Sequence, residues 1–313
     1  MNCKSSCMAS GAEAISSLTL FPKVLTSLRN LPSLGVFGAK DHNLISDSIV
    51  KIGYRHIDAA QALGNEQLIG EGVNQAVEHG VKREDIHVSS KMYRAYYEDP
   101  VKACQKTLKA LRLDYLDLFM VHWPMPDFEK DKKTFKRAPM YQVWQGMEEC
   151  VRLGLTKSIG VSNFGVQMMI DMLTYADIPP ACNQVEVHPY YQQQDLVKFC
   201  DKYDITVIAY SPLSCPARPV GGKCSNALKD PLLEEIAATH GKTVAQIALA
   251  WNLQLGNVVI PKTNNLNRAQ ENLEACSITL SAQEMRKISS ISTNQKIFDP
   301  KNWPIYGKIP LFA

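Results

Sequence analysis

Seven short, β-prone segments of this sequence each have, within the segment or just past it, a polar side chain that can take part in proton transfer or hydrogen bonding. The positions are Asp58, Lys91, His122, Asn163, Gln184, Tyr210 with Ser211, and Lys262. An acid, a lysine and a histidine on three consecutive segments are the residue types of general acid–base chemistry. Polar residues are common where a strand meets a loop, so a single one of these positions is weak evidence for a functional site. The set as a whole is stronger evidence.

The segments that carry these residues alternate with amphipathic stretches from residue 54 onward. Between the β-prone runs, stretches such as NEQLIGEGVNQAVEHG (65–80) and DPVKACQKTLKALRL (99–113) repeat apolar residues at the spacing of a helix. This alternation predicts βαβ units and a parallel sheet. Seven strands are legible, at 54–57, 86–90, 115–121, 158–162, 183–187, 206–211 and 257–261, and we expect an eighth in SITLS at 277–281.

Eight parallel strands can form an open sheet or close into a barrel. An open dinucleotide-binding sheet should carry G-x-G-x-x-G after its first strand, but GEGVNQ (70–75) lacks the third glycine and lies in a predicted helix. GGKC (221–224) lacks the other features of a P-loop. We therefore predict an α/β fold, a (β/α)8 TIM barrel in a single domain, whose strand ends meet at one mouth.

Composition narrows the class of protein further. The chain has 313 residues, 45% hydrophobic and 21% charged, so it can bury a large core without disulfides or a metal. Its net charge of +3, with both signs interspersed, gives no footprint for nucleic acid or an anionic membrane. No apolar run approaches the ~18 residues of a membrane span. We expect no metal, no nucleic acid and no membrane partner.

The cysteines and the first thirty residues indicate in which cellular compartment the protein is expected. Nine cysteines without a C-x-x-C pair predict free thiols in a reducing compartment, and we expect the protein to be cytoplasmic. The first thirty residues are rich in Ser and Ala, as transit peptides are, but contain one arginine and no continuous apolar core. We expect 1–29 to be a flexible accessory extension, and 30–313 to form the barrel with its C-terminal tail over the mouth.

Several motifs, in order from about residue 30 to the end, resemble those of aldo-keto reductases of the aldose and aldehyde reductase type. They are GYRHIDAA, VSSKMY, LDYLDLFMVHWP, GLTKSIGVSNF, NQVEVHPYY, AYSPL, VVIPKT and RAQENL. The resemblance implies a barrel that binds NADPH across its C-terminal mouth and reduces a small-molecule carbonyl substrate. We expect such a protein to be a monomer.

The resemblance implies four catalytic residues, of which three are present. Asp58, Lys91 and His122 match, but Leu63 stands immediately before GNE, where the family has the tyrosine that protonates the substrate oxygen. Two interpretations stay open. One is an NADPH-dependent reductase of aldehydes or ketones, including quinones or dicarbonyls, with reduced or altered efficiency. The other is a catalytically impaired NADPH-binding homologue with a sensing or structural role.

The substrate pocket is expected to include Leu63, Tyr93, Trp123 and Trp303. Three replacements for the missing acid stay open: Tyr93, two residues beyond Lys91, His122, or a water polarised by Lys91. For Tyr93 a role in the pocket wall is the simpler interpretation.

The cofactor site follows from the same resemblance. The family holds the nicotinamide amide with residues that match Ser162, Asn163 and Gln184, and stacks the ring on the match of Tyr210. Independently, a helix that begins near Leu266 beside two cations suits a phosphate, because its free N–H groups and dipole favour an anion. In the family the matches of Lys262, Thr263 and Arg268 read the 2′-phosphate, so the resemblance implies NADPH rather than NADH. The full set of cofactor residues is Ser162, Asn163, Gln184, Tyr210, Ser211, Leu213, Lys262, Thr263, Arg268, Glu271 and Asn272.

Overall fold

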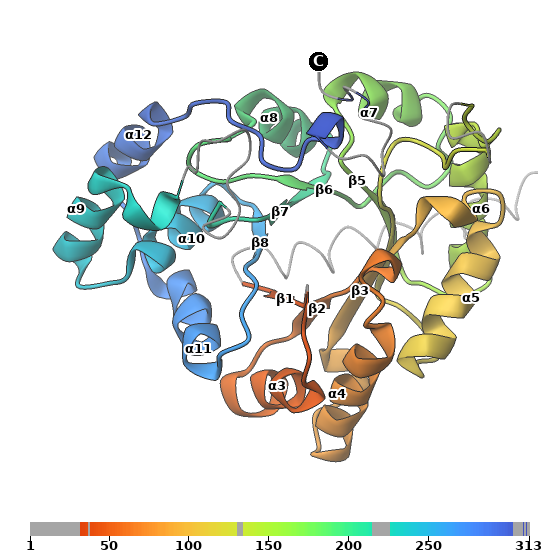
Figure 1. The fold of residues 1–313 in the computed structure, drawn as a ribbon, viewed down its shortest axis with the longest axis horizontal. Helices are drawn as coiled ribbons and strands as arrows, with labels where there is room; N and C mark the ends of the chain where they lie inside the picture. The colour runs from red at the N-terminus through yellow and green to blue at the C-terminus, as the bar shows by residue number, and fades with distance from the viewer. Residues whose placement is uncertain are drawn as a thin grey trace, which may run out of the picture.

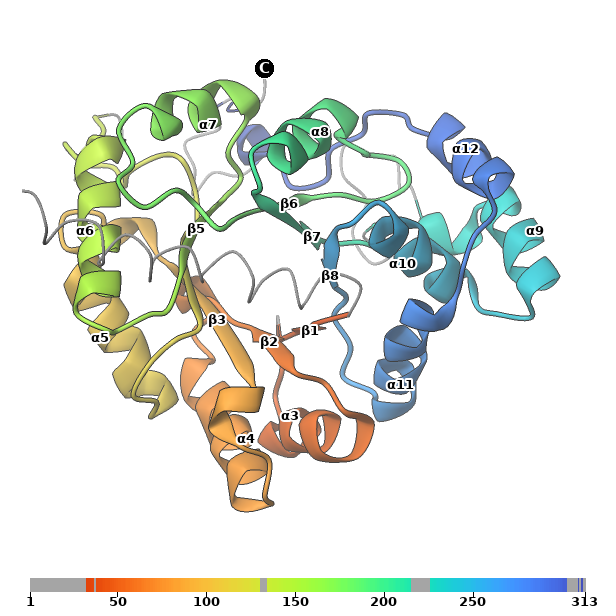
Figure 2. The same cartoon turned by 180° about the vertical axis from the view of Figure 1, so that it is seen from behind.

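The computed structural model describes residues 32–36, 38–129, 134–214, 226–302, 309 and 311. Eight parallel strands form one sheet in the sequential order β1 to β8, and helices surround the strands on the outside (Figures 1 and 2). The strands are β1 (Leu34–Gly35), β2 (His56–Asp58), β3 (His87–Met92), β4 (Leu118–Val121), β5 (Ile159–Ser162), β6 (Cys182–Glu186), β7 (Thr206–Tyr210) and β8 (Val258–Ile260).

Main-chain hydrogen bonds join the first strand to the last. Ser33 N donates to Val259 O at 2.8 Å and Gly35 N donates to Pro261 O at 3.1 Å. A side chain at position 35 would not fit, because a Cβ there would lie 2.8 Å from Ile260 O. The sheet thus closes on itself, and the predicted (β/α)8 barrel is confirmed.

The predicted position of one strand is wrong. Residues 277–281 form no strand, and the eighth strand is β1, which precedes the seven that were recognised. Leu280 pairs its main chain with a side chain instead: its N–H donates to Gln254 Oε1 and its carbonyl accepts from Gln254 Nε2, both at 2.9 Å. With only two residues, β1 is too short to show any periodicity in the sequence.

Several helices begin at a side chain that caps their first turn. Asp99 Oδ1 accepts from Lys102 N before a proline at the first helical position, and Thr243 with Gln246 forms a reciprocal capping box. Within the described ranges no helix has the length and apolar character needed to span a bilayer. The α-helices are α3 (His42–Asp47), α4 (Glu66–Glu78), α5 (Pro100–Leu111), α6 (Met140–Arg152), α7 (Val166–Leu173), α8 (Gln194–Lys202), α9 (Pro231–His240), α10 (Val244–Gln254), α11 (Leu266–Glu274) and α12 (Ala282–Ser290).

The interior of the barrel has an apolar side and a polar side. The apolar side is a cluster from β4, β6, β7 and β8, with residues Leu118, Met120, Cys182, Ile208, Val258 and Ile260. On the polar side, His56 of β2 and His87 of β3 meet edge to face with ring centroids 4.7 Å apart. Among the described residues, neither ring nitrogen of His87 has a hydrogen-bond partner.

Both histidines are held in the neutral form. Burial, followed by the neighbouring His87, lowers the pKa of His56 to about 3. Burial, followed by Lys157 and Arg83, lowers the pKa of His87 to about 3 as well. A neutral ring without partners inside a barrel costs free energy of folding, and this cost rises in acid.

We predict that His87→Phe makes the protein less sensitive to acid. On unfolding, the ring of His87 regains an ordinary pKa of ~6.5, so the unfolded state binds protons first and the free energy of unfolding falls as pH drops. For one such histidine the loss between about pH 7.5 and about pH 5.5 is about 1.4 kcal/mol. Urea unfolding at both pH values should show a drop smaller by roughly this amount in His87→Phe.

The exposed His79 provides the matched control, because His79→Phe should leave the acid sensitivity of the unaltered protein in place. An equal loss of stability on acidification in His87→Phe and in the unaltered protein would contradict the prediction.

Candidate active site

A buried ion pair lies at the carboxyl ends of β2 and β3. Lys91 Nζ is 2.6 Å from Asp58 Oδ2, and the two residues are 4% and 5% exposed. Lys91 Nζ also donates to the carbonyl of Ala59 at 2.8 Å. The structure thus brings together two of the three predicted catalytic residues.

Two more donors hold the carboxylate of Asp58. Ser89 Oγ donates to Asp58 Oδ1 at 2.8 Å, and Gln184 Nε2 donates to the same oxygen at 2.9 Å. Because Gln184 belongs to β6, this bond crosses the interior of the barrel. Three donors on one buried carboxylate supply the hydrogen bonds that it would otherwise receive from water.

The bond from Ser89 continues into the barrel as a chain of hydrogen bonds. Ser89 Oγ lies 3.0 Å from His56 Nε2, and His56 Nδ1 lies 2.5 Å from Ser33 Oγ. All three residues are buried. The sequence reasoning missed them, although the period of two along a strand puts Ser89 on the same face as Lys91.

A second group of polar side chains lies beside Gln184. Ser162 Oγ donates to Gln184 O at 2.7 Å, and Asn163 Nδ2 donates to Ser162 Oγ at 3.1 Å. Tyr210 OH donates to Asn163 Oδ1 at 2.8 Å. Asn163 has a φ of 67°, a left-handed conformation that asparagine tolerates better than most residues. The four predicted nicotinamide contacts therefore form one connected cluster.

His122 follows β4 and lies close to Lys91. Its Nδ1 atom is buried and has no hydrogen-bond partner among the described residues. Burial, followed by the Lys91 cation, lowers the pKa of His122 to about 3, so the ring is neutral near pH 7. The His122 carbonyl accepts from Asn163 Nδ2 at 2.9 Å, which ties the third predicted catalytic residue to the cofactor cluster. The ring of Trp123 stacks on His122 at 6.3 Å.

Leu63 and Tyr93 lie on neighbouring loops that one side chain connects. Leu63 ends a short 3-10 helix, η2 (Gln61–Leu63), and both Leu63 and Tyr93 are half-buried. Gln61 Oε1 accepts from Tyr93 N at 2.8 Å, while Gln61 Nε2 donates to Ala103 O at 2.8 Å. The turn that carries Leu63 is therefore fixed against the ends of β3 and α5.

The expected phosphate end of the cofactor site lies around β8 and α11. Helix α11 begins at Leu266, as predicted, and Asn265 Oδ1 caps it by accepting from Arg268 N at 3.1 Å. Lys262 and Arg268 are exposed. Thr263 and Asn272 are buried, and Glu271 is half-buried. No hydrogen bond among the described residues links this group to the cluster around Gln184.

The chain turns sharply where β7 ends. Ser214 N donates to Ser211 O at 2.9 Å, Ser211 has a φ of 50°, and Leu213 between them is half-buried. Trp303, predicted in the substrate pocket, lies outside the described residues, as do 1–29 and most of the tail beyond Asn302.

A buried carboxylate fixes the start of the tail, which the sequence reasoning did not predict. Glu186, the last residue of β6, is fully buried and accepts from Ile297 N at 2.7 Å and from Phe298 N at 2.8 Å. The ring of Phe298 then packs edge-on against Tyr210, with centroids 5.6 Å apart.

The residues present fit a nicotinamide. Within the described residues no hydrogen bond reaches Gln184 Oε1, so this atom can accept from a carboxamide NH₂ group. Tyr210 is half-buried and offers an aromatic ring beside the amides. His122 Nδ1, which has no partner within the described part of the chain, is a further buried polar atom at this mouth. Among the described residues no cluster of three or more His, Cys, Asp or Glu side chains could hold a metal ion.

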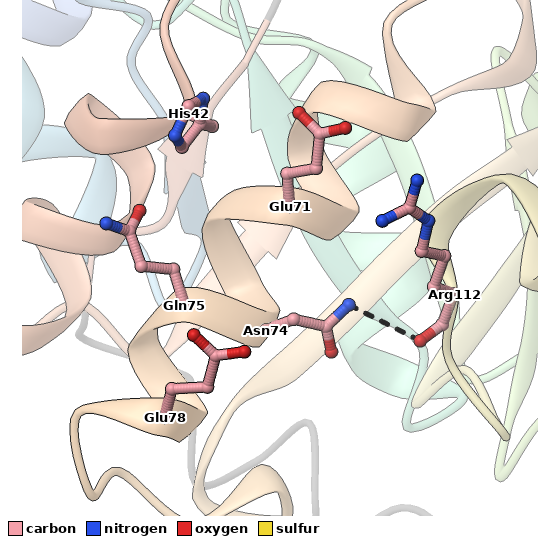
Figure 3. Close-up of a pocket in the computed structure, with 6 residues that line it drawn as sticks. All are labelled: His42, Glu71, Asn74, Gln75, Glu78 and Arg112. Atoms are coloured by element: carbon pink, nitrogen blue, oxygen red, sulfur yellow. Dashed lines mark hydrogen bonds between the residues drawn. The ribbon is translucent and has the colours of Figure 1, made fainter.

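A surface hollow of 390 Å³ lies elsewhere, on the outer helices (Figure 3). Among the lining residues drawn in Figure 3, one hydrogen bond is marked: Asn74 Nδ2 donates to Arg112 O at 3.4 Å. None of the predicted site residues lines it. The lining residues are His42, Glu71, Asn74, Gln75, Glu78 and Arg112.

Comparisons with known proteins agree with this arrangement. The model of the "Aldo/keto reductase family" matches residues 39–293. "Aldose reductase B" of Dictyostelium discoideum is 39% identical, covering 93% of this chain and 97% of its own length. An "NADP-dependent D-sorbitol-6-phosphate dehydrogenase" of Malus domestica is also 39% identical, covering 81% of this chain and 87% of its own.

Solved structures give the same result. The crystal structure of a Bombyx mori aldo-keto reductase in complex with NADP superposes with a TM-score of 0.81 at 31% identity, covering 88% of this chain and 92% of that one. The barrel, the clustered strand-end residues and these matches together show that the chain belongs to the aldo/keto reductase family.

Proposed function

We propose that the protein is an NADPH-dependent oxidoreductase that reduces aldehydes or ketones to alcohols. The observation that carries the proposal is the contact between the buried Asp58–Lys91 pair and Gln184, because it joins a site for acid–base chemistry to a site for a carboxamide. The relatives support the cofactor, since one is named for NADP and another was solved with NADP.

Each part of the site would have a separate role. When bound, NADPH supplies a hydride for the carbonyl carbon. Ser162, Asn163 and Gln184 would hold the carboxamide, and Tyr210 would stack on its ring. Neutral His122 would orient the carbonyl oxygen. The remaining cofactor contacts would come from Ser211, Leu213, Lys262, Thr263, Arg268, Glu271 and Asn272.

Leu63 narrows the substrate class. Its side chain cannot give a proton to a substrate oxygen, so substrates whose reduced oxygen is weakly basic are favoured. Quinones and 1,2-dicarbonyls have this property, and simple aldehydes do not. Leu63, Tyr93, Trp123 and Trp303 are the proposed pocket residues. We further propose that the protein acts as a monomer in the cytoplasm.

Leu63 also favours a second candidate function, an NADPH-binding homologue that senses the cofactor or has a structural role. This candidate predicts quenching of cofactor fluorescence on binding, without oxidation of NADPH by any carbonyl. Reduction of at least one carbonyl would exclude it.

We predict that an aromatic o-quinone is turned over faster than a simple aromatic aldehyde. We expect Leu63→Tyr to raise kcat for the aldehyde by roughly tenfold or more, because a well-placed general acid contributes ~10²–10⁴. The measurement is NADPH oxidation followed by absorbance. Leu63→Phe provides the control, since it adds the ring without the hydroxyl. Aldehyde turnover equal to or above that of the quinone in the unaltered protein would contradict the substrate class.

We predict that Arg268→Ala weakens NADPH binding by roughly tenfold and NADH binding much less, because the lost charge-assisted hydrogen bond concerns only the 2′-phosphate. Fluorescence quenching titrations with both cofactors give the two Kd values. Gln270→Ala, also exposed on α11, is the matched control. An equal loss of affinity for NADPH and for NADH would contradict a contact between Arg268 and the 2′-phosphate.

A further inference from the structure

We propose that Lys91 itself is the general acid of this protein, in place of the tyrosine hydroxyl that Leu63 lacks. The proposal rests on the proposed carbonyl reduction, and it assigns to Lys91 a proton transfer rather than only an electrostatic role. It follows from comparing every proton donor that the described residues place around the Asp58 carboxylate.

The other donors in this cluster are already engaged or too weak. The hydroxyl of Tyr210 is used by Asn163 Oδ1 at 2.8 Å. The ring of His122 is neutral, and a neutral imidazole N–H is a very weak acid. Asp58 only accepts hydrogen bonds, from Lys91, Ser89 and Gln184. Among the described residues of this cluster, the ammonium of Lys91 is left; Tyr93, on the neighbouring loop, is the rival donor that the test below includes.

Lys91 has a proton available for transfer. Its ammonium carries three N–H groups, of which one donates to Asp58 Oδ2 and one to Ala59 O. The third has no partner among the described residues. An ammonium can give a proton to an alkoxide, because an alkoxide is far more basic than a neutral amine.

The step balances without any further reactant. The carbonyl carbon receives the hydride, its π electron pair moves to oxygen, and this oxygen takes a proton from Lys91. The substrate is reduced by two electrons to the alcohol, and NADPH is oxidised to NADP⁺. Lys91 is left as a neutral amine, which regains its proton from solvent when the product leaves.

The hydrogen bonds on Asp58 explain how this site tolerates a lysine without its charge. While Lys91 is neutral, the buried carboxylate loses its cation and depends on its remaining donors. Ser89 and Gln184 keep their bonds to Asp58 Oδ1 through this state. Ser89 is in turn held by His56. We therefore infer that Ser89 is a positioning residue for proton transfer, acting through Asp58.

The first test separates charge from proton transfer with Lys91→Arg and Lys91→Ala. Arginine keeps a cation but does not give up its proton near neutral pH, so we expect kcat to fall by about 100-fold or more, within the usual range for a lost general acid. The Kd for NADPH, measured by fluorescence quenching, should stay within about twofold, which also shows that the variants fold.

Chemical rescue decides whether a proton is involved. Lys91→Ala leaves space for a small cation, and methylammonium should restore part of kcat, whereas tetramethylammonium, which has no N–H, should not. Equal rescue by the two cations, or no rescue by either, overturns the proposal. The proposal is also overturned if kcat of Lys91→Arg lies within about threefold of the kcat of the unaltered protein. If, in addition, Tyr93→Phe loses turnover, Tyr93 is the donor.

A failure of the proposed function looks different. If the unaltered protein fails to oxidise NADPH with any of the carbonyls tested, then the proposed carbonyl reduction is wrong, and the proposed role of Lys91 is wrong with it. If the unaltered protein is active and Lys91→Arg remains active, only the assignment of the acid is wrong.

The second test uses two adjacent serines. Ser89 donates to Asp58, whereas Ser90 points its hydroxyl to Glu66 Oε1 at 2.8 Å. In Ser89→Ala the Asp58 carboxylate loses one of the two donors that remain to it while Lys91 is neutral. We expect kcat to fall several-fold, with KM and the Kd for NADPH little changed. Ser90→Ala should leave kcat in place, and Ser89→Thr should restore it. Equal kcat values in the two alanine variants would contradict this role of Ser89.

Discussion

The Asp58–Lys91 ion pair is the constraint on which the rest of this site depends. Two opposite charges buried at 2.6 Å are stable only while their geometry and their remaining hydrogen bonds are maintained. Strand register provides this geometry, because Asp58 pairs with Ser89 in the parallel ladder of β2 and β3. Lys91 then lies two residues further along the same face, within reach of the carboxylate. The closing bonds between β1 and β8 preserve that register around the barrel.

The same pair is hydrogen-bonded to the cluster proposed to hold the cofactor. Gln184 donates to Asp58 across the barrel, and its main-chain carbonyl accepts from Ser162, so one residue is bonded to both groups. The carbonyl of His122 is held by Asn163 in the same way. These contacts make the mouth one polar unit, which agrees with the family to which the chain belongs. The altered position, Leu63, lies on a separate turn held by Gln61 and leaves the unit intact.

Sequence patterns were informative where a periodicity was long enough to read. The strands β2 to β8, the start of α11 near Leu266 and the grouping of Asp58, Lys91 and Gln184 were predicted, whereas β1 was not, because two residues have no period. The chain from Ser89 to Ser33 was missed since buried serines are common and their partners are distant in sequence. The role of Glu186 in holding the tail was missed because its partners there are main-chain N–H groups, which every residue but proline has.

The attachment of the tail to Glu186 has a consequence for how this family can vary. Ile297 and Phe298 are held through their peptide nitrogens, so the anchor places no demand on the side chains at these two positions except that neither be proline. Substitution at position 298 can therefore change the ring that packs on Tyr210 while the main-chain attachment to Glu186 is kept. The side chain beside Tyr210 and the anchor of this segment can thus vary independently of each other.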